Sequence, residues 1–281
     1  MMSPKQTGVL YIAATPIGNL ADVSHRLIET LGKVDLIACE DTRHTRKLLS
    51  HLGISTPLTS YYREIEQKKS QTLLRKLLDG LEIAIVSDAG TPGFSDPGAV
   101  LVRLARTNDI PVIPLPGPSA LATALSVSGL TQPDFYFGGF PPARKGERKK
   151  FFSSLKRLHC SLFFYESPHR IQKTLRDCLL VFGDRHAQLF RELTKLHEEH
   201  ITGTLSQLLQ YAEKRVRGEL VLVIEGLQAE EEERPDNLDE LIIWYRDQGD
   251  ISLKDAAKRI ATDLDMSRSR IYQRALTLWK C

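Results

Sequence analysis

The segment Val86–Gly98, VSDAGTPGFSDPG, carries the residue types in this chain of 281 residues that are best suited to ligand binding. Three glycines, two prolines and two aspartates follow directly after the apolar run IAIV. Glycine-rich turns after strands often cradle phosphates, but this one has no lysine for a P-loop and no G-x-G-x-x-G spacing. Its two carboxylates would repel a phosphate. The segment therefore favours a neutral or cationic ligand that is held largely by backbone groups.

Similar turns follow the other strand-like runs of the chain. They are TPIGN (15–19), EDTRHT (40–45), PGPS (116–119), YESPHR (165–170), RELTK (191–195) and RGE (217–219). Each turn alone is equally well explained as a connecting loop. In open α/β sheets, however, ligands lie outside the carboxyl ends of the strands, where the first of these turns would gather. S-adenosylmethionine has a sulfonium, an amino acid and an adenosine but no phosphate, so it suits such a site, with methyl transfer as one option.

The elements that must position these turns alternate between β-rich runs and amphipathic stretches. We expect strands at 9–15, 34–40, 58–62, 82–87 and 111–116, and helices at 22–32, 42–53, 67–79, 97–107 and 118–129. This order predicts a parallel sheet with helices on both faces. After FYFGGFPP (135–142), a second round follows, with strands at 161–167, 187–193 and 219–226 and helices at 168–183 and 204–216.

The predicted fold class is α/β, with two α/β domains and a small C-terminal helical module. The boundaries give an N-terminal α/β domain at 1–139, a C-terminal α/β domain at 140–228 and a helical module at 237–281. Apolar residues make up 42% and charged residues 26% of the chain, as in soluble globular proteins. No apolar run approaches a membrane span, and no signal peptide is expected. The four cysteines lack C-x-x-C spacing, which indicates reduced thiols and a cytoplasmic protein.

Charge is unevenly distributed although the net charge is only +3. Segment 143–157 has seven basic residues and one acidic residue, and the tail 252–281 has seven basic and three acidic. Segment 229–240 has seven acidic residues and one basic, which is typical of a solvated linker. Each basic segment is either a solvated face or a contact for nucleic acid. HEEH (197–200) lacks the H-E-x-x-H spacing and has no third ligand, so we expect no metal site.

Taken together and in this order, TPIGNL, EDTRHT, VSDAGTPGFSDPG, PLPGPSA, GGFPPARKGERKK, FFYESPHR and RELTK resemble the tetrapyrrole-methylase superfamily. Within it, they resemble the ribosomal RNA small-subunit methyltransferase I subfamily, from about Gly8 to the end of the chain. The resemblance implies S-adenosylmethionine bound in a cleft between two α/β domains, and a homodimer. It also implies transfer of a methyl group to the ribose 2′-hydroxyl of a cytidine in the decoding region of 16S rRNA, as naked RNA or in the small ribosomal subunit.

The tail is similar to a helix-turn-helix module with two short helices on either side of LDMS (264–267). We expect Ser267 to cap the second helix, with Arg268, Arg270 and Arg274 along it.

The resemblance also assigns site residues. The expected cofactor contacts are Pro16, Ser87, Asp88, Ala89, Pro116, Ser119, Phe140, Tyr165, Glu166, Leu193, Thr194 and Gly218. The basic residues expected to hold RNA phosphates are Arg43, Arg46, Lys47, Arg144, Lys145, Arg148, Lys149 and Lys150.

A ribose hydroxyl is a weak acid, so the reaction needs a group that takes its proton. Glu40 and Asp41 are our candidates, at the carboxyl end of the second strand beside Arg43. The alternative is that both carboxylates only cap the helix that starts at Thr42.

Two other functions remain open from the sequence. One is methylation of a tetrapyrrole or of a protein histidine by the same fold. The other is a helix-turn-helix regulator whose large domain senses a metabolite. The basic tail argues against a small macrocycle as substrate, and the clustered charges of EDTRHT argue against a simple sensor.

Overall fold

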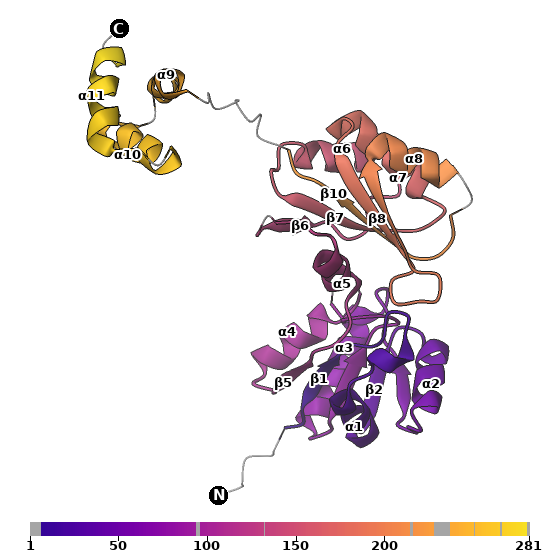
Figure 1. Cartoon of the computed structure of the whole chain (residues 1–281). Helices are drawn as coiled ribbons and strands as arrows, with labels where there is room; N and C mark the ends of the chain where they lie inside the picture. Colours follow the sequence, from indigo (N-terminus) through magenta and orange to yellow (C-terminus); the bar gives the residue numbers. More distant parts are fainter. Residues whose placement is uncertain are drawn as a thin grey trace, which may run out of the picture. The chain divides into compact units, whose positions relative to one another are not determined.

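Figure 1 shows a computed structural model of the chain, which describes residues 7–93, 96–131, 133–213, 216–227, 237–249, 251–264 and 266–279. The chain forms two compact units, Met1–Leu227 and Gln228–Cys281. The acidic stretch expected as a linker lies outside the described residues as far as position 236. The division of the first unit into domains at 139/140 stays a prediction.

The first sheet is entirely parallel and has the strand order β3-β2-β4-β1-β5. Its strands are β1 (Leu10–Ala13), β2 (Leu36–Cys39), β3 (Leu58–Ser60), β4 (Ile83–Val86) and β5 (Val112–Leu115). Its helices are the 3-10 turn η1 (Leu20–Asp22), α1 (His25–Lys33), α2 (Thr42–His51), α3 (Glu66–Leu78), α4 (Ala99–Thr107) and α5 (Ala120–Val127). All four residues of β4 are buried, as a strand covered on both faces requires.

Helices cover both faces of this sheet, as the alternating pattern predicts. Leu73 of α3 and Leu101 of α4 pack with Ile85 in one apolar cluster. Leu27 of α1 and Leu49 of α2 pack with other residues of the sheet in a second cluster. The predicted α/β fold class is confirmed.

The second sheet is mixed, with the order β6-β7-β10-β8-β9. Its strands are β6 (Phe135–Phe137), β7 (Ser161–Glu166), β8 (His186–Arg191), β9 (Glu199–Thr204) and β10 (Leu220–Ile224). Only the β6–β7 pair is parallel, and the other pairs are antiparallel. Three helices, α6 (Lys145–Leu155), α7 (Ile171–Phe182) and α8 (Leu205–Glu213), pack on one face through a large apolar cluster.

Helix α5 covers the other face of the second sheet and joins the two sheets (Figure 1). Leu121 and Ala124 of α5 are buried in one cluster with Phe163, Phe190 and Val223 of that sheet. The helix that completes the first α/β repeat therefore supplies the core of the second half.

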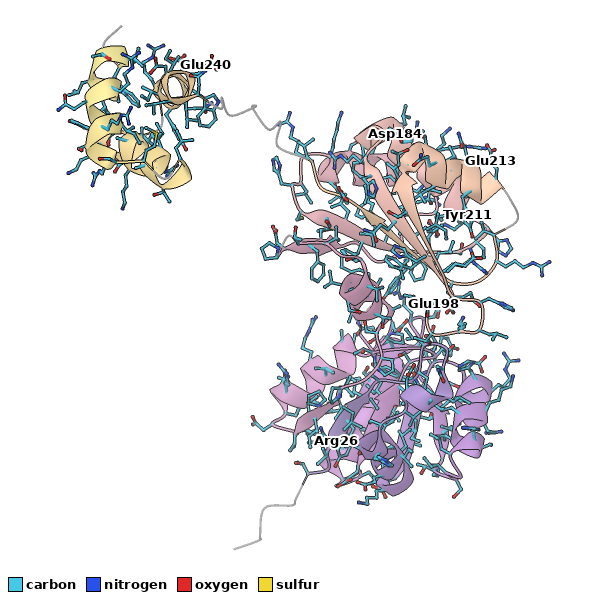
Figure 2. All side chains as sticks on the ribbon, in the orientation of Figure 1. Arg26, Asp184, Glu198, Tyr211, Glu213 and Glu240 are labelled. Carbon is cyan, nitrogen blue, oxygen red and sulfur yellow. The ribbon has the colours of Figure 1, made fainter. Side chains whose placement is uncertain are left out.

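The sequence analysis missed α6, β6 and β9. Helix α6 lies in the basic segment, where few apolar residues mark a helical period. Strand β9 has the sequence EHITGT and contains no fully buried residue. Side chains add to its backbone pairing with β8: the hydroxyl of Tyr211, which Figure 2 labels, donates to Glu199 (2.6 Å), and Glu199 also pairs with Arg191 (2.8 Å).

The C-terminal unit contains three helices around its own apolar core. They are α9 (Leu238–Gln248), α10 (Leu253–Asp263) and α11 (Arg268–Leu278). Ser267 occupies the N-cap position of α11, but its hydroxyl pairs with that of Ser269 rather than with a backbone N–H, so the expected side-chain cap is wrong. Arg274 donates to Asp239 of α9 (2.7 Å), whereas Arg268 and Arg270 are exposed.

Glu66, in the first turn of α3, connects that helix to the start of α4. Its carboxylate accepts hydrogen bonds from the Gly98 N–H (2.8 Å) and the Tyr61 hydroxyl (3.2 Å). Burial raises the pKa of Tyr61 to about 12, so its hydroxyl remains a donor at neutral pH. A carboxylate at the N-terminus of α4 also complements the helix dipole. Glu66 thereby fixes the end of the glycine-rich segment.

We predict that Glu66→Ala lowers the free energy of unfolding by about 1–3 kcal/mol, because it leaves buried donors without their acceptor. Glu66→Gln keeps an acceptor and should cost less. Urea denaturation followed by circular dichroism measures both. The exposed neighbour Gln67→Ala should stay within about 0.5 kcal/mol of the wild type; an equal loss in both positions would contradict the assigned role.

Candidate active site

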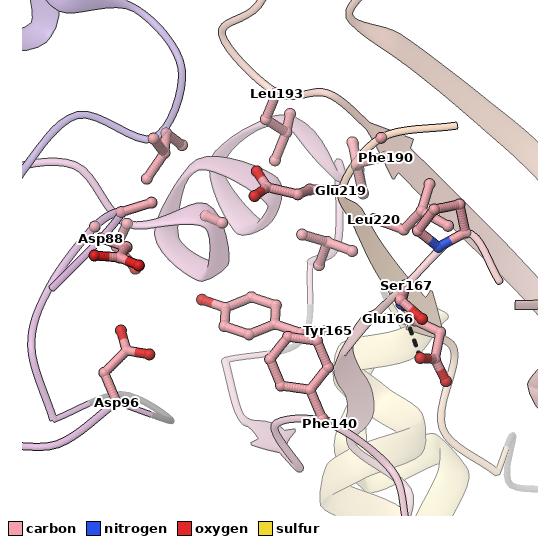
Figure 3. Close-up of a pocket in the computed structure, with 18 of the residues that line it drawn as sticks. Asp88, Asp96, Phe140, Tyr165, Glu166, Ser167, Phe190, Leu193, Glu219 and Leu220 are labelled. Carbon is pink, nitrogen blue, oxygen red and sulfur yellow. Dashed lines mark hydrogen bonds between the residues drawn. The ribbon is translucent and has the colours of Figure 1, made fainter. Parts of the chain in front are cut away.

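A cavity of about 430 Å³ lies between the two sheets of the first unit (Figure 3). Its size is in the range of small-molecule and cofactor sites. The cavity is lined by Ile17, Asp88, Ala89, Gly90, Thr91, Asp96, Ser119, Ala120, Phe140, Tyr165, Glu166, Ser167, Pro168, Phe190, Leu193, Gly218, Glu219, Leu220 and Val221. The turns after β1, β4 and β5 thus meet at one sheet edge, where ligands bind in open α/β sheets.

Hydrogen bonds fix the turn after β4 against the turn after β1. Thr15 and Gly90 exchange two backbone hydrogen bonds, of 2.9 and 3.0 Å. The Thr15 hydroxyl donates to the Ser87 carbonyl (3.0 Å), and the Ser87 hydroxyl donates to the Gly90 carbonyl (3.0 Å). Both side chains are buried. Ser87 therefore shapes the turn from behind instead of lining the cavity.

Aromatic rings form the opposite wall. Tyr165 of β7 lies edge-on to Phe137 and to Phe140, with ring centroids 4.9 and 5.6 Å apart. The Tyr165 hydroxyl accepts a hydrogen bond from the Leu121 N–H at the start of α5 (3.1 Å). Burial raises the pKa of Tyr165 above its ordinary value. Tyr165 thus connects the two halves of the site and remains protonated at neutral pH.

The turn after β8 closes the cavity against the turn after β1. A Cβ on Gly18 would come within 2.4 Å of the Lys195 side chain and 2.8 Å of the Thr194 hydroxyl, so only glycine fits. Glu192 and Thr194 have φ angles of 52° and 67°, which non-glycine residues seldom adopt. Such strained turns persist where the surrounding structure imposes them, often at binding sites.

Eight of the twelve residues expected to contact the cofactor line this cavity: Asp88, Ala89, Ser119, Phe140, Tyr165, Glu166, Leu193 and Gly218. The other four do not. Ser87 and Thr194 lie behind the lining in the turns described above, Pro16 is half-buried beside Ile17, and Pro116 is exposed at the end of β5. Whether each residue contacts the cofactor stays a prediction.

The Glu166 carboxylate anchors helix α7. It accepts hydrogen bonds from the Ser167 N–H (2.8 Å, dashed in Figure 3) and the Thr174 hydroxyl (2.5 Å), and it pairs with Arg170 (3.3 Å). Arg170 also donates to the Pro141 carbonyl, next to Phe140. Glu166 therefore positions a wall of the cavity through its neighbours.

Four carboxylates gather at the edge of the first sheet, those of Glu40, Asp41, Asp88 and Asp96. Asp41 caps α2 by accepting from the Arg43 N–H (2.8 Å), and hydrogen bonds from the Arg43 guanidinium and N–H hold the pKa of its carboxyl below the usual value. Asp88 accepts from the Asp41 N–H (3.1 Å). Burial, and then the charge of Asp88, raise the pKa of Glu40. Neither Glu40 nor Asp41, the two predicted catalytic residues, lines the cavity.

Asp96 is one of the cavity-lining residues that our sequence analysis did not assign to the site. It lines the cavity, and burial together with the charges of Glu40 and Asp88 raises its pKa to about 6. Figure 3 shows Asp96 and Asp88 on one side of the cavity and Tyr165 and Phe140 on the other. The sequence did contain a signal for it: Asp96 is the second aspartate of the glycine-rich segment and lies just before the start of α4.

The basic residues expected to bind RNA differ in their availability. On α2, Arg46 and Lys47 are exposed, and Arg43 is exposed but paired with Asp41. At α6, Lys145 and Lys150 are exposed, Lys149 is half-buried, and Arg144 pairs with Glu147.

Arg148 is not placed where a phosphate could reach it. Its side chain is only 3% exposed and pairs with Asp177 at 2.7 Å. It also donates to the carbonyls of Pro142 and Ala143. Because these contacts occupy the guanidinium inside the protein, we remove Arg148 from the RNA-binding set and assign it a structural role.

Within the described part of the chain, no group of three or more His, Cys, Asp or Glu residues is arranged to hold a metal ion. Two of the HEEH residues contact side chains of the neighbouring strand β8. His200 stacks on Phe190 and shares a hydrogen bond with Gln188 (2.9 Å), and Glu199 pairs with Arg191. No described helix has both the length and the apolar character to cross a membrane.

The cavity combines an apolar and aromatic lining with carboxylates on one rim. Ile17, Phe190, Leu193 and Val221 offer an apolar surface for a planar heterocycle, and Asp88 and Asp96 offer negative charge. This combination suits a ligand that carries a positive charge and an aromatic base. Two β-sheets with their helices enclose this cavity. The protein therefore belongs to the class of two-sheet α/β proteins that bind a small molecule between their halves.

The chain belongs to the tetrapyrrole methylase family. The family profile described as Tetrapyrrole (Corrin/Porphyrin) Methylases matches residues 9–209. The ribosomal RNA small subunit methyltransferase I of Halalkalibacterium halodurans is 43% identical, over 94% of this chain and 93% of the relative. The protein of the same name from Escherichia coli O157:H7 is 44% identical, over 96% and 95%. The predicted family is confirmed.

A solved structure supports the fold independently. Uroporphyrin-III C-methyltransferase from Thermus thermophilus, complexed with S-adenyl homocysteine, superimposes with a TM-score of 0.56 at 15% identity. The superposition covers 78% of this chain and 97% of that one. At this identity the likeness concerns the fold alone.

We predict that Arg148→Met lowers the free energy of unfolding by about 3–5 kcal/mol, because it leaves the buried Asp177 carboxylate without its partner. Thermal and urea denaturation measure this loss. Lys149→Met, at the next position of α6, should change stability by no more than about 0.5 kcal/mol. A stable Arg148→Met protein with weakened RNA binding would contradict the structural role.

Proposed function

We propose that this protein transfers a methyl group from S-adenosylmethionine to the ribose 2′-hydroxyl of a cytidine in the decoding region of 16S rRNA. The observation that carries the proposal is the match, over nearly the whole chain, to relatives named ribosomal RNA small subunit methyltransferase I. A cavity at the strand ends that fits a cationic, phosphate-free cofactor supports it. We further propose, from the family resemblance, that the protein acts as a homodimer in the cytoplasm.

The residues of the cavity match the parts of S-adenosylmethionine, which supplies an electrophilic methyl group on a sulfonium. Apolar side chains and the rings of Tyr165 and Phe140 would hold the adenine, and Asp88 and Asp96 would favour the positive charge. Backbone groups of the turns at Gly90 and Gly218 would hold polar atoms. None of these contacts requires a metal ion.

Basic residues around the site would hold the RNA backbone. Arg46 and Lys47 on α2, with Lys145 and Lys150 on α6, are exposed cations that can bind phosphates. The rim of the cavity is acidic and repels the RNA phosphates. A neutral ribose, rather than a phosphate, would therefore lie at the mouth of the cavity. Alignment of the ribose oxygen with the methyl group is then the principal contribution of the fold.

The direct test is incubation of the purified chain with labelled S-adenosylmethionine and small ribosomal subunits that lack their methyl groups. We expect label on one cytidine ribose, mapped by nuclease digestion and mass spectrometry. Naked 16S rRNA in a parallel reaction identifies the form of the substrate. A folded protein that binds the cofactor but labels neither RNA would refute the proposed function, and label on a base or on protein would assign another acceptor.

We predict metal-independent binding of S-adenosylmethionine, measured by calorimetry in the presence of a chelator. At one hundred times its Kd, the ligand should stabilise the fold by about 2.7 kcal/mol. Phe140→Ala should weaken binding about 5–10-fold, since one aromatic contact is worth about 1–1.5 kcal/mol. Phe135→Ala is the control, because Phe135 is similarly exposed but lies outside the cavity. Equal effects of the two variants would argue against binding in this cavity.

We predict that a chain ending at residue 236 binds RNA more weakly but binds S-adenosylmethionine normally. Each phosphate contact contributes about 0.7–0.9 to the slope of log K against log salt. In the full chain, Arg268→Gln with Arg270→Gln should therefore reduce the slope by roughly 1–2. Arg274 is left intact because it holds α11 to α9. An unchanged slope in both proteins would show that the C-terminal unit does not bind phosphates.

A further inference from the structure

We propose that a groove between the start of α7 and the end of α8 binds phosphates of the RNA strand that carries the target ribose. None of the basic residues that the sequence analysis assigned to RNA lines this groove. The inference rests on the proposed function and adds a second contact surface for the RNA substrate beside the cofactor cavity.

The groove encloses about 600 Å³. Buried Ala212 and half-buried Val216 give it a small apolar surface. Figure 2 labels Glu213, which lies at the end of α8. The exposed side chains that line the groove are all charged or imidazole groups: His169, Lys173, Glu213 and Arg217.

A hydrogen bond joins the two helices at the groove. The Nε2 amide of Gln172 on α7 donates to the Ala212 carbonyl near the end of α8 (2.6 Å). The last carbonyls of a helix carry partial negative charge, and this bond occupies one of them. The groove is therefore held in shape and offers one acceptor fewer to repel an anion.

Charge favours an anionic ligand in the groove. Lys173 and Arg217 contribute two positive charges against the one negative charge of Glu213, and the imidazole of His169 can donate a hydrogen bond. Within the part of the chain that the structure describes, no carboxylate forms an ion pair with either cation. The cofactor cavity has the opposite character, because its rim carries carboxylates.

The groove and the cofactor cavity adjoin each other. Pro168, in the turn after β7, and Gly218, in the turn before β10, line both of them. An RNA strand whose ribose lies at the mouth of the cavity has phosphates on both sides of that ribose. The acidic rim repels these phosphates, and the cationic groove beyond the shared turns attracts them.

The exposure of the lining cations decides between RNA and a free phosphate ion. A single small anion would remain hydrated beside exposed side chains, and each exposed ion pair is weak. An RNA strand carries one phosphate per nucleotide, so it can contact Lys173 and Arg217 at once and join the weak contacts into one binding event. Arg176, which is exposed three residues further along α7, extends the cationic surface in the direction of the helix.

The first test measures binding of a short single-stranded RNA by fluorescence anisotropy over a series of salt concentrations, with the full chain. Each phosphate contact with a single strand contributes about 0.7 to the slope of log K against log salt. Lys173→Gln with Arg217→Gln should therefore reduce this slope by roughly 1–1.5 and lower affinity about 10-fold at low salt. Binding of S-adenosylmethionine, measured by calorimetry, should be unchanged, because both side chains line the groove and not the cavity.

Arg75→Gln with Lys76→Gln is the matched control, since it removes the same two charges from an exposed surface. These residues lie in the last turn of α3, which precedes β4, so they are at the opposite edge of the first sheet from the cavity. An equal loss of RNA affinity in the two double variants would show that only the net charge matters and would overturn the groove as a site.

Glu213→Gln separates phosphate binding from a structural role. Removing the negative charge from the groove should strengthen RNA binding and increase the rate of association, while Tm stays near that of the wild type. Weaker binding by Glu213→Gln, or no change, would contradict a phosphate site at this place.

A competition experiment identifies the form of the anion. Inorganic phosphate at the same ionic strength as a chloride control should displace little RNA, whereas an unlabelled RNA strand should displace all of it. If the Lys173 and Arg217 double variant keeps its RNA affinity but loses binding of inorganic phosphate, the groove holds a free anion and the proposal is wrong. A wild-type protein that binds RNA through the groove but methylates none would refute the proposed function and leave the groove as an RNA site.

Discussion

The packing of α5 against the second sheet is the interaction on which the rest of the structure depends. The helix belongs to the first α/β repeat by chain order, yet Leu121 and Ala124 are buried among Phe163, Phe190 and Val223. Its first turn also donates to Tyr165. Because α5 follows β5 of the first sheet and packs on the second sheet, the turns of the first sheet face the strands of the second. The cavity is the space that this arrangement leaves at the strand ends.

The carboxylates at and near the cavity destabilise one another. Glu40, Asp88 and Asp96 repel one another, and burial raises the pKa of Glu40 and of Asp96. A fold selected only for stability would separate them or supply a cation to each. Active sites commonly retain such unfavourable arrangements, since a ligand or a reacting group relieves them. A cationic ligand in this cavity would therefore be favoured by the same field that costs the empty protein stability.

The sequence predicted the parallel sheet, its helices and the edge at which the turns converge, because buried strands and amphipathic helices have clear periods. It did not predict α6 or β9, whose residues are mostly polar and gain stability from partners distant in the chain. The same reason explains why the burial of Arg148 was not predicted. The residues of a basic run look alike in the sequence, and only the pairing with Asp177, 29 residues away, distinguishes the buried one. Asp96 was missed because its raised pKa comes first from burial and then from the charges of Glu40 and Asp88, and only the folded sheet brings these about.

The polarity of β9 has a consequence for the protein in a crowded solution. This strand is an edge of the second sheet, so among the residues that the structure describes one side of its backbone has no strand partner. Flat apolar edges invite pairing with strands of other molecules and so lead to aggregation. The sequence EHITGT places charged, imidazole and hydroxyl groups along this edge, and Arg191 and Tyr211 hold Glu199 in place there. The polar character that makes β9 hard to recognise as a strand also keeps newly made copies of the chain from joining edge to edge.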